Sequence, residues 1–227
     1  MNIKNHAKNQ VESYEKNSCY FKIAKKFLKG GRLVLFSGTP CQIGGLKNYL
    51  RKAGASLIHS HSQILSLPVI PIELENEYKV CDDFYKKMGI NMYEHIIKEE
   101  LNYKERVIHN SENFLIFIPE VCKFTGDIVI LFKENIYFNE IDENKLNELS
   151  IIMKKLFTKI YEKDKNCPFN LYLHCHPLNE ENDYKNKYNV HIHIVPRKFN
   201  FGGFELSTGM YISSKKSEDI AKNLKFD

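Results

Sequence analysis

The sequence predicts an α+β fold, in which an antiparallel half-barrel sheet with packed helices follows a short βα segment. Residues 105–132 contain three short runs of β-branched and aromatic residues, and polar, Pro or Gly breaks separate these runs as in an antiparallel meander. Residues 144–163 then carry apolar side chains at helical spacing, so this helix should pack across the sheet. Alternating runs near the C-terminus supply the remaining strands.

The first fifty residues are expected to form a βα unit. Apolar residues at helical spacing lead to Gly30-Gly31, which ends a helix before an apolar strand. The expected elements are a helix over 20–29, a strand over 32–36 and, after turn residues 37–40, a helix over 41–50.

The remaining elements follow from period and from breakers. Amphipathic runs ending at Gly or polar residues predict helices, and short β-branched or aromatic runs predict strands. In chain order we expect a strand over 56–65, helices over 73–87 and 92–101, strands over 105–110, 114–118 and 127–132, a helix over 144–163, and strands over 170–175, 189–195 and 204–212.

Composition limits the classes of function. Of 227 residues, 43% are hydrophobic, which is enough for a substantial core. The N-terminus has no apolar run of signal-peptide length and no segment approaches the roughly 18 apolar residues of a membrane span, so a cytoplasmic protein without membrane contact is expected.

The cysteine pattern and the net charge limit the possible classes of function further. The six cysteines form no CxxC pair and no disulfide framework, so reduced thiols are expected. The net charge of +5 is scattered along the chain, which suits anionic substrates and lacks the basic block of a nucleic-acid-binding protein.

His59, His61 and Gln63 alternate within a predicted strand, so they share one face of it. An imidazole there could attack phosphorus, a second could orient it, and the amide could hold a phosphoryl oxygen. A His-rich strand edge without chemistry would show the same alternation.

A second histidine cluster lies near the C-terminus. His191 and His193 share a strand face, with Ile192 and Ile194 on the other, and an antiparallel neighbour could bring His174 opposite them. Three imidazoles with a carboxylate would suit zinc or ferrous iron. The alternative is a buried histidine pair that is hydrogen-bonded to its neighbours.

Four stretches carry a resemblance to a known family: AGASLIHSHSQILSLPVIP at 53–71, FNLYLHCHPL at 169–178, YNVHIHIVPR at 188–197 and GGFELSTG at 202–209. Together they resemble the galactose-1-phosphate uridylyltransferases of the histidine-triad superfamily. The resemblance covers residues 53–227, roughly the second half of a family member.

This resemblance implies a ping-pong transfer of UMP between UDP-glucose and a hexose 1-phosphate in galactose metabolism. His61 would be the nucleophile that becomes uridylylated, Gln63 and Ser60 would contact substrate, and Ser60 stands where the family often has Pro. A homodimer is implied, with Phe204 and Glu205 near the hexose site. The implied metal ligands are Glu77, His174, His191 and His193 for zinc or iron, with His59 matching a further zinc ligand whose partner cysteines this chain lacks.

Two alternatives remain open. NVHIHIVPR also resembles the signature strand of small histidine-triad nucleotide hydrolases, in which His193 would be the nucleophile, although Val195 stands where a third histidine is expected. The uridylyltransferase resemblance lacks the family's first half, so a truncated fusion that binds nucleotide without catalysis would also fit.

Residues 1–52 carry a different resemblance. GRLVLFSGTPCQIGGLKNYL at 31–50 resembles a fragment of the beta subunit of coenzyme F420-reducing hydrogenase, but the cluster-binding cysteine runs of that family are absent, so no flavin or iron–sulfur cluster is implied. We therefore expect two parts, a grafted βα segment over 1–52 and a histidine-triad-like domain over 53–227. A graft without its native sheet should be the part most open to proteolysis, with cleavage before about residue 53.

Overall fold

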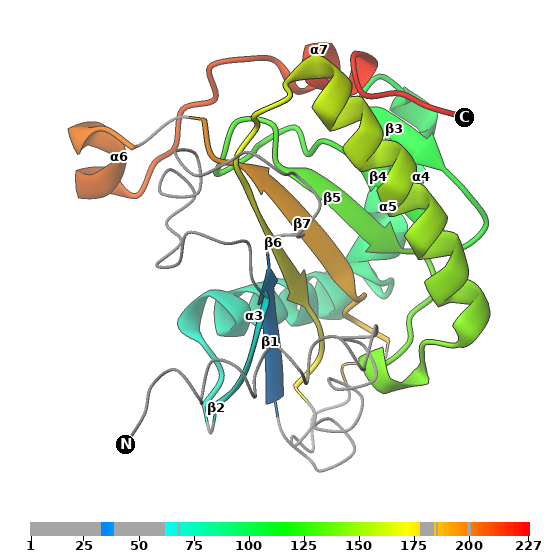
Figure 1. The fold of residues 1–227 in the computed structure, drawn as a ribbon. Helices are drawn as coiled ribbons and strands as arrows, with labels where there is room; N and C mark the ends of the chain where they lie inside the picture. Colours follow the sequence, from blue (N-terminus) through cyan, green and yellow to red (C-terminus); the bar gives the residue numbers. More distant parts are fainter. Residues whose placement is uncertain (1–32, 39–61, 68, 178–183, 185, 199–200) are drawn as a thin grey trace, which may run out of the picture.

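The computed structural model describes residues 33–38, 62–67, 69–177, 184, 186–198 and 201–227. Within these residues one antiparallel sheet has the strand order β2-β1-β6-β7-β5-β4-β3 (Figure 1). The strands are β1 Leu33–Gly38, β2 Ser62–Leu67, β3 Val107–Asn110, β4 Phe114–Phe117, β5 Ile128–Phe132, β6 Phe169–His174 and β7 His191–Pro196. The expected α+β class with an antiparallel sheet is confirmed.

The helices in the described residues are α3 Ile72–Met88, α4 Met92–Tyr103, α5 Glu143–Lys163, α6 Gly203–Thr208 and α7 Ser217–Lys222, with a short 3-10 turn over Phe138–Glu140. Helices α3 and α4 pack on one face of this sheet, and helices α5 and α7 pack on the other. The expected helices over 73–87, 92–101 and 144–163 are confirmed to within two residues at each end. No helix in the described part of the chain is long and apolar enough to cross a membrane.

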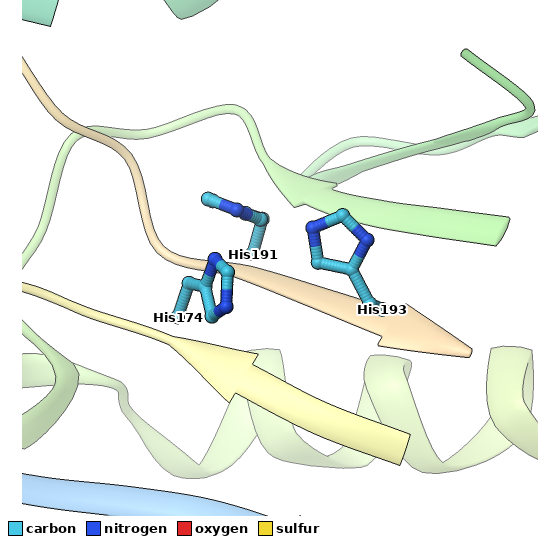
Figure 2. A group of neighbouring side chains, drawn as sticks. All are labelled: His174, His191 and His193. Atoms are coloured by element: carbon cyan, nitrogen blue, oxygen red, sulfur yellow. The ribbon is translucent and has the colours of Figure 1, made fainter. Parts of the chain in front are cut away.

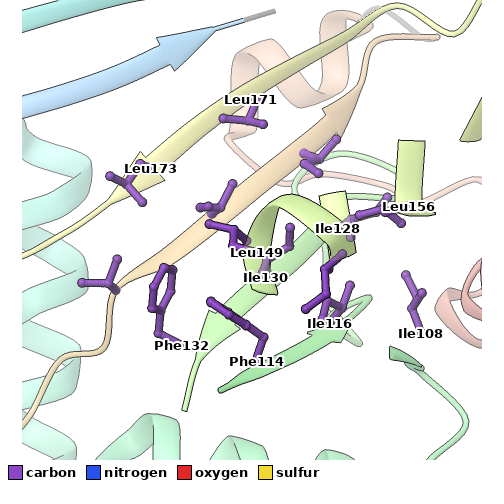
Figure 3. Packing of buried hydrophobic residues seen from close by; sticks show 14 of the residues in the cluster. Ile108, Phe114, Ile116, Ile128, Ile130, Phe132, Leu149, Leu156, Leu171 and Leu173 are labelled. Atoms are coloured by element: carbon purple, nitrogen blue, oxygen red, sulfur yellow. The ribbon is translucent and has the colours of Figure 1, made fainter. Parts of the chain in front are cut away.

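Strand β5 divides the core because its successive side chains face opposite sides. Ile128, Ile130 and Phe132 pack in a cluster with α5 and α7, where Leu149 and Leu156 of α5 lie over the sheet (Figure 3). Val129 and Leu131 pack in a second cluster, which α3 and α4 cover. Since each fully buried Leu, Ile or Phe stabilises the fold by about 1.5–3 kcal/mol, the two clusters hold helices on both faces.

Strand β1 lies inside the sheet, between β2 and β6. Ser37 is opposite Gln63 of β2 on one side and opposite Tyr172 of β6 on the other. The expected strand over 32–36 is therefore present, and the described part of residues 1–52 shares the sheet of the C-terminal part. The domain boundary near residue 52 stays a prediction, and the helices expected over 20–29 and 41–50 lie outside the described residues.

The expected strand over 204–212 is wrong. Residues 203–208 form helix α6, because the Glu205 side chain accepts a hydrogen bond from the Gly202 backbone N–H at 3.0 Å and fixes the first turn. Gly209 ends the helix with a φ of 69°, a conformation that glycine adopts without strain. Helix α6 projects away from the sheet (Figure 1).

Candidate functional site

Three imidazoles meet on the sheet face that α3 covers. His191 and His193 alternate along β7, and the antiparallel register sets His174 of β6 directly opposite His191 (Figure 2). One ring nitrogen from each lies within 4.8 Å of the others, so the three could hold one metal ion. The sequence-based expectation that β6 brings His174 to the β7 pair is confirmed.

Glu77 of α3 joins this cluster. Its Oε2 lies 2.9 Å from Nδ1 of His174, a close contact that is not aligned as a hydrogen bond, and its Oε1 lies 3.2 Å from Nε2 of His191. Burial alone would raise the pKa of the Glu77 carboxyl, but the charge of His191 and the approach of His174 and His191 hold it well below its usual range. The carboxylate is thus ionised and faces two imidazoles.

Tyr93 at the start of α4 donates its hydroxyl to Oε1 of Glu77 at 2.6 Å. Burial and the charge of Glu77 raise the pKa of Tyr93 well above its ordinary value, so the phenol keeps the proton that it donates. Asn91 positions this helix end, because its side chain accepts from the Tyr93 backbone N–H at 2.8 Å.

The tautomer of His191 follows from its neighbour. Its Nδ1 lies 2.9 Å from the backbone oxygen of Asn189, and since a carbonyl only accepts, Nδ1 carries a proton. The remaining Nε2 faces the ionised Glu77. Burial lowers the pKa of His191, but the charge and hydrogen bond of Glu77 outweigh it and raise the pKa above its ordinary value. Either a proton or a metal cation on Nε2 would balance this carboxylate.

A hydrogen bond from Nδ1 also fixes the orientation of His193, and here the acceptor is a side chain. Both carboxylate oxygens of the buried Asp127 lie 3.0 Å from its Nδ1, so Nδ1 donates to Asp127 and Nε2 is the nitrogen that faces the cluster. Tyr172 stacks on the His193 ring with centroids 4.8 Å apart. Burial lowers the pKa of His174 although Glu77 favours its charged form, so this ring is neutral near pH 7.

These donors fit a bound metal ion. Two of the three histidines give their Nδ1 proton to an oxygen, the arrangement that fixes the tautomer of metal-binding imidazoles and frees Nε2. Three imidazoles and one carboxylate are also ligands that suit zinc or iron.

The strand β2 connects this cluster to the first histidine motif. Gln63 is opposite Ser37, Ser37 is opposite Tyr172, and Tyr172 is opposite His193. Directly opposed residues of an antiparallel sheet share a face, so the register position of Gln63 falls on the row and face of His193. His59, Ser60 and His61 lie outside the described residues.

Phe204 and Glu205 are not part of the histidine cluster. They belong to α6, where the Glu205 side chain caps the helix and the Phe204 side chain is 48% exposed. Their implied place near a hexose stays a prediction.

Sequence reasoning missed Asp127, Tyr93 and Asn189, which orient the cluster. Asp127 had one usable signal, since it is a carboxylate at the start of an otherwise apolar run. Its partner is 66 residues away along the chain, so no local spacing reveals the pair. The contact of Tyr93 with Glu77 depends on the packing of α4 beside α3 and has no sequence signal.

Comparison with known proteins gives a family match over most of the chain. Residues 43–223 match the galactose-1-phosphate uridyl transferase C-terminal domain. An ADP-glucose phosphorylase of Arabidopsis thaliana is 30% identical over 177 residues, which are 78% of this chain and 49% of that protein. A galactose-1-phosphate uridylyltransferase of Haemophilus influenzae is 28% identical over 147 residues, 63% of this chain and 41% of that protein.

Solved structures agree with this match. The ADP-glucose phosphorylase of Arabidopsis thaliana with bound ADP-glucose superposes with a TM-score of 0.75 and 26% identity, over 92% of this chain and 64% of that one. The chain spans about half the length of the curated relatives that it matches.

Proposed function

The chain belongs to the galactose-1-phosphate uridylyltransferase family through the C-terminal domain of that family, and on this basis we propose that it transfers a nucleotidyl group from a nucleotide sugar to a phosphate acceptor through His61. The observation that carries the proposal is the cross-sheet row of Gln63, Ser37, Tyr172 and His193. This row aligns β2, the strand that follows His61 in the sequence, with His193 of the second histidine cluster.

The proposed reaction has two displacements at phosphorus. An imidazole nitrogen of His61 forms a bond to the α-phosphorus of the nucleotide sugar, and the bond from that phosphorus to the bridging oxygen breaks, which releases the sugar 1-phosphate. A phosphate oxygen of the acceptor then attacks the nucleotidyl-histidine, and the imidazole leaves. Gln63 would donate its amide N–H to a phosphoryl oxygen during both steps.

Either of two phosphate compounds could be the acceptor in the second step, because each offers a phosphate oxygen as the nucleophile. A hexose 1-phosphate would yield a new nucleotide sugar, as the names of the uridylyltransferase relatives indicate, and inorganic phosphate would yield a nucleoside diphosphate, as the name of the phosphorylase relative indicates. We propose UDP-glucose with a hexose 1-phosphate as the substrates. The second candidate is ADP-glucose with phosphate, which the 30% identity to the phosphorylase favours.

We propose one zinc or iron ion on Glu77, His174, His191 and His193. When bound, it would offset the Glu77 charge and hold α3, β6 and β7 at fixed positions beside the row. His59 is proposed to bind no metal, because no pair of cysteines stands near it in the sequence. Elemental analysis should give about one ion per chain, and a His191→Ala, His193→Ala double variant should lose it.

The test of the transfer is a covalent label. The protein is incubated with UDP-glucose or ADP-glucose that carries ³²P in the α-phosphate, then denatured at alkaline pH, because a phosphorus–nitrogen bond is acid-labile. Label should stay on the wild type and be absent from His61→Asn. The nucleotide that labels the protein identifies the donor, and release of the label by galactose 1-phosphate or by phosphate identifies the acceptor.

Two further variants separate the alternatives. His95→Asn, a change on α4 outside the cluster, should label like the wild type. His193→Asn should reduce the metal content of the protein more than it reduces the labelling. If label survives in His61→Asn and is lost in His193→Asn, the nucleophile lies in the second cluster, and the hypothesis of a nucleotide hydrolase that uses His193 is correct. If neither nucleotide sugar labels the wild type, the chain binds nucleotide without this chemistry.

A further inference from the structure

A cavity of about 210 Å³ lies on the face of the sheet opposite the histidines. The end of α5, the start of β5, the end of β7 and helix α7 surround it, and Ile128, Ile160 and Leu224 line its apolar part. Ile128 and Leu224 are buried members of the core cluster under α5. The cavity is therefore an opening into the edge of that core.

The alternation of β5 separates this cavity from the proposed active site. Ile128 faces the cavity, whereas the next residue, Val129, is opposite His193 and packs under α3. The cavity and the histidine cluster are on the two sides of one layer of sheet, so a ligand in one does not touch the other.

The rim of the cavity has an excess of positive charge. Lys163, Lys198 and Lys215 line it, against the carboxylates of Asp164 and Asp219. Only Lys198 is paired, with its Nζ 2.6 Å from Asp164. Among the described residues, Lys163 and Lys215 have no ion-pair partner.

The lysines also repel one another. Partial desolvation lowers the pKa of the Lys163 ammonium, and the charges of Lys215 and Lys198 lower it further. An anion between these side chains would remove that repulsion. An apolar group attached to the anion would fill the space beside Ile128, Ile160 and Leu224.

We propose that this cavity binds a small molecule with one anionic group and a compact apolar body, such as an aromatic phosphate ester or carboxylate. The ligand head would lie between Lys163 and Lys215, and its body would enter the cavity. The volume is larger than the roughly 150 Å³ of a cavity that accommodates benzene, which sets the size of the apolar body at about one ring.

The test uses phenyl phosphate as the probe, with amide chemical shifts of the ¹⁵N-labelled protein as the readout. Phenyl phosphate should bind with a Kd of about 1 mM or lower and shift the amides of Gly126, Ile220 and Asn223. Phenol, which lacks the charge, and inorganic phosphate, which lacks the ring, should each bind at least about tenfold more weakly.

Variants assign the charge. A Lys163→Met, Lys215→Met double variant should weaken phenyl phosphate by about tenfold or more, and Lys154→Met, an exposed lysine on the same helix, should leave its affinity unchanged. Three outcomes would overturn the proposal: no binding at about 10 mM, equal affinity in the double variant, or shifts confined to residues around His193.

Discussion

At the scale of single residues, the orientation of His193 depends on Asp127. The two carboxylate oxygens fix the Nδ1 proton, and only then does Nε2 point its lone pair into the cluster. The same logic holds for His191, whose Nδ1 proton goes to the backbone of Asn189. One of these anchors is a side chain and can be changed without altering any proposed ligand.

We expect Asp127→Asn to weaken metal binding by about 10- to 100-fold while the protein stays folded, because a neutral amide orients the imidazole less firmly and does not raise its basicity. Metal affinity is measured by competition with a chromophoric chelator, with circular dichroism as the check on folding. Asp83→Asn, an exposed change on α3, is the matched control. Equal affinities in the two variants would show that Asp127 has no role in orienting the ligand.

At the scale of elements, β1 is the most consequential strand, because it is the only link between β2 and the rest of the described sheet. We expect Ser37→Pro to lower the free energy of unfolding by about 3 kcal/mol, since proline removes a ladder hydrogen bond in a strand that is paired on both sides. For a domain of this size, the melting temperature should fall by roughly 6–12 °C.

Ser37→Val is the control for that experiment, because valine suits a strand and keeps the backbone N–H. If Ser37→Pro melts at the temperature of Ser37→Val, β1 does not contribute to the stability of the sheet, and residues 1–52 behave as the separate graft that the sequence suggests. Early proteolytic cleavage before residue 53 would point the same way.

The elements also show how far sequence reasoning reaches. Helices α3, α4 and α5 were predictable because apolar period and end signals are local, and Gly89 ends α3 where the sequence places the break. Helix α6 was not, because none of its residues is buried and hydrogen bonds within the segment, such as that from the Gly202 backbone N–H to the Glu205 side chain, hold its conformation. The shared strand face of His191 and His193 was predictable from alternation, whereas Asp127 and Tyr93 reach the cluster through long-range packing.

At the scale of the whole molecule, an apolar surface around α6 suggests how two copies would associate. Phe204, Leu206, Met210 and Ile212 are 48%, 75%, 59% and 69% exposed, although each is apolar. We expect a homodimer through this surface, and Leu206→Asp should shift it toward monomer. Light scattering after size-exclusion chromatography measures the change, with Glu162→Asp on the surface of α5 as control. A wild-type monomer at micromolar concentration would contradict the expectation.

The two core clusters on opposite sheet faces should unfold together, and buried cysteines in both clusters can report on this unfolding. Burial raises the pKa of Cys81 and Cys175 to about 12 and that of Cys122 to about 11. Since a free thiol titrates near pH 8.5, these thiols should react with iodoacetamide far more slowly than free cysteine at pH 8, and the rate in the folded protein should keep rising with pH up to about pH 11.

Urea titration with mass-spectrometric readout tests the cooperativity in a Cys19→Ser, Cys41→Ser background, and the buried thiols of Cys81, Cys122 and Cys175 are the three reporters. Cys81 lies in the cluster under α3, and Cys122 and Cys175 lie in the cluster under α5. All three should become reactive at the same urea concentration. Labelling of Cys81 at a lower concentration than the other two would show that the histidine face opens independently.

The position of β1 also has a consequence for the time course of folding. Its partners in β2 are 24 to 34 residues away along the chain, but its partners in β6 are 133 to 137 residues away. Pairing of β1 with β2 closes a short stretch of chain at low entropic cost, whereas pairing with β6 closes a much longer stretch and should follow the ordering of more of the chain. The β1–β2 pair should thus form early as a local hairpin and dock on β6 late. Substitutions at the β1–β6 contact should then accelerate unfolding and leave the refolding rate nearly unchanged.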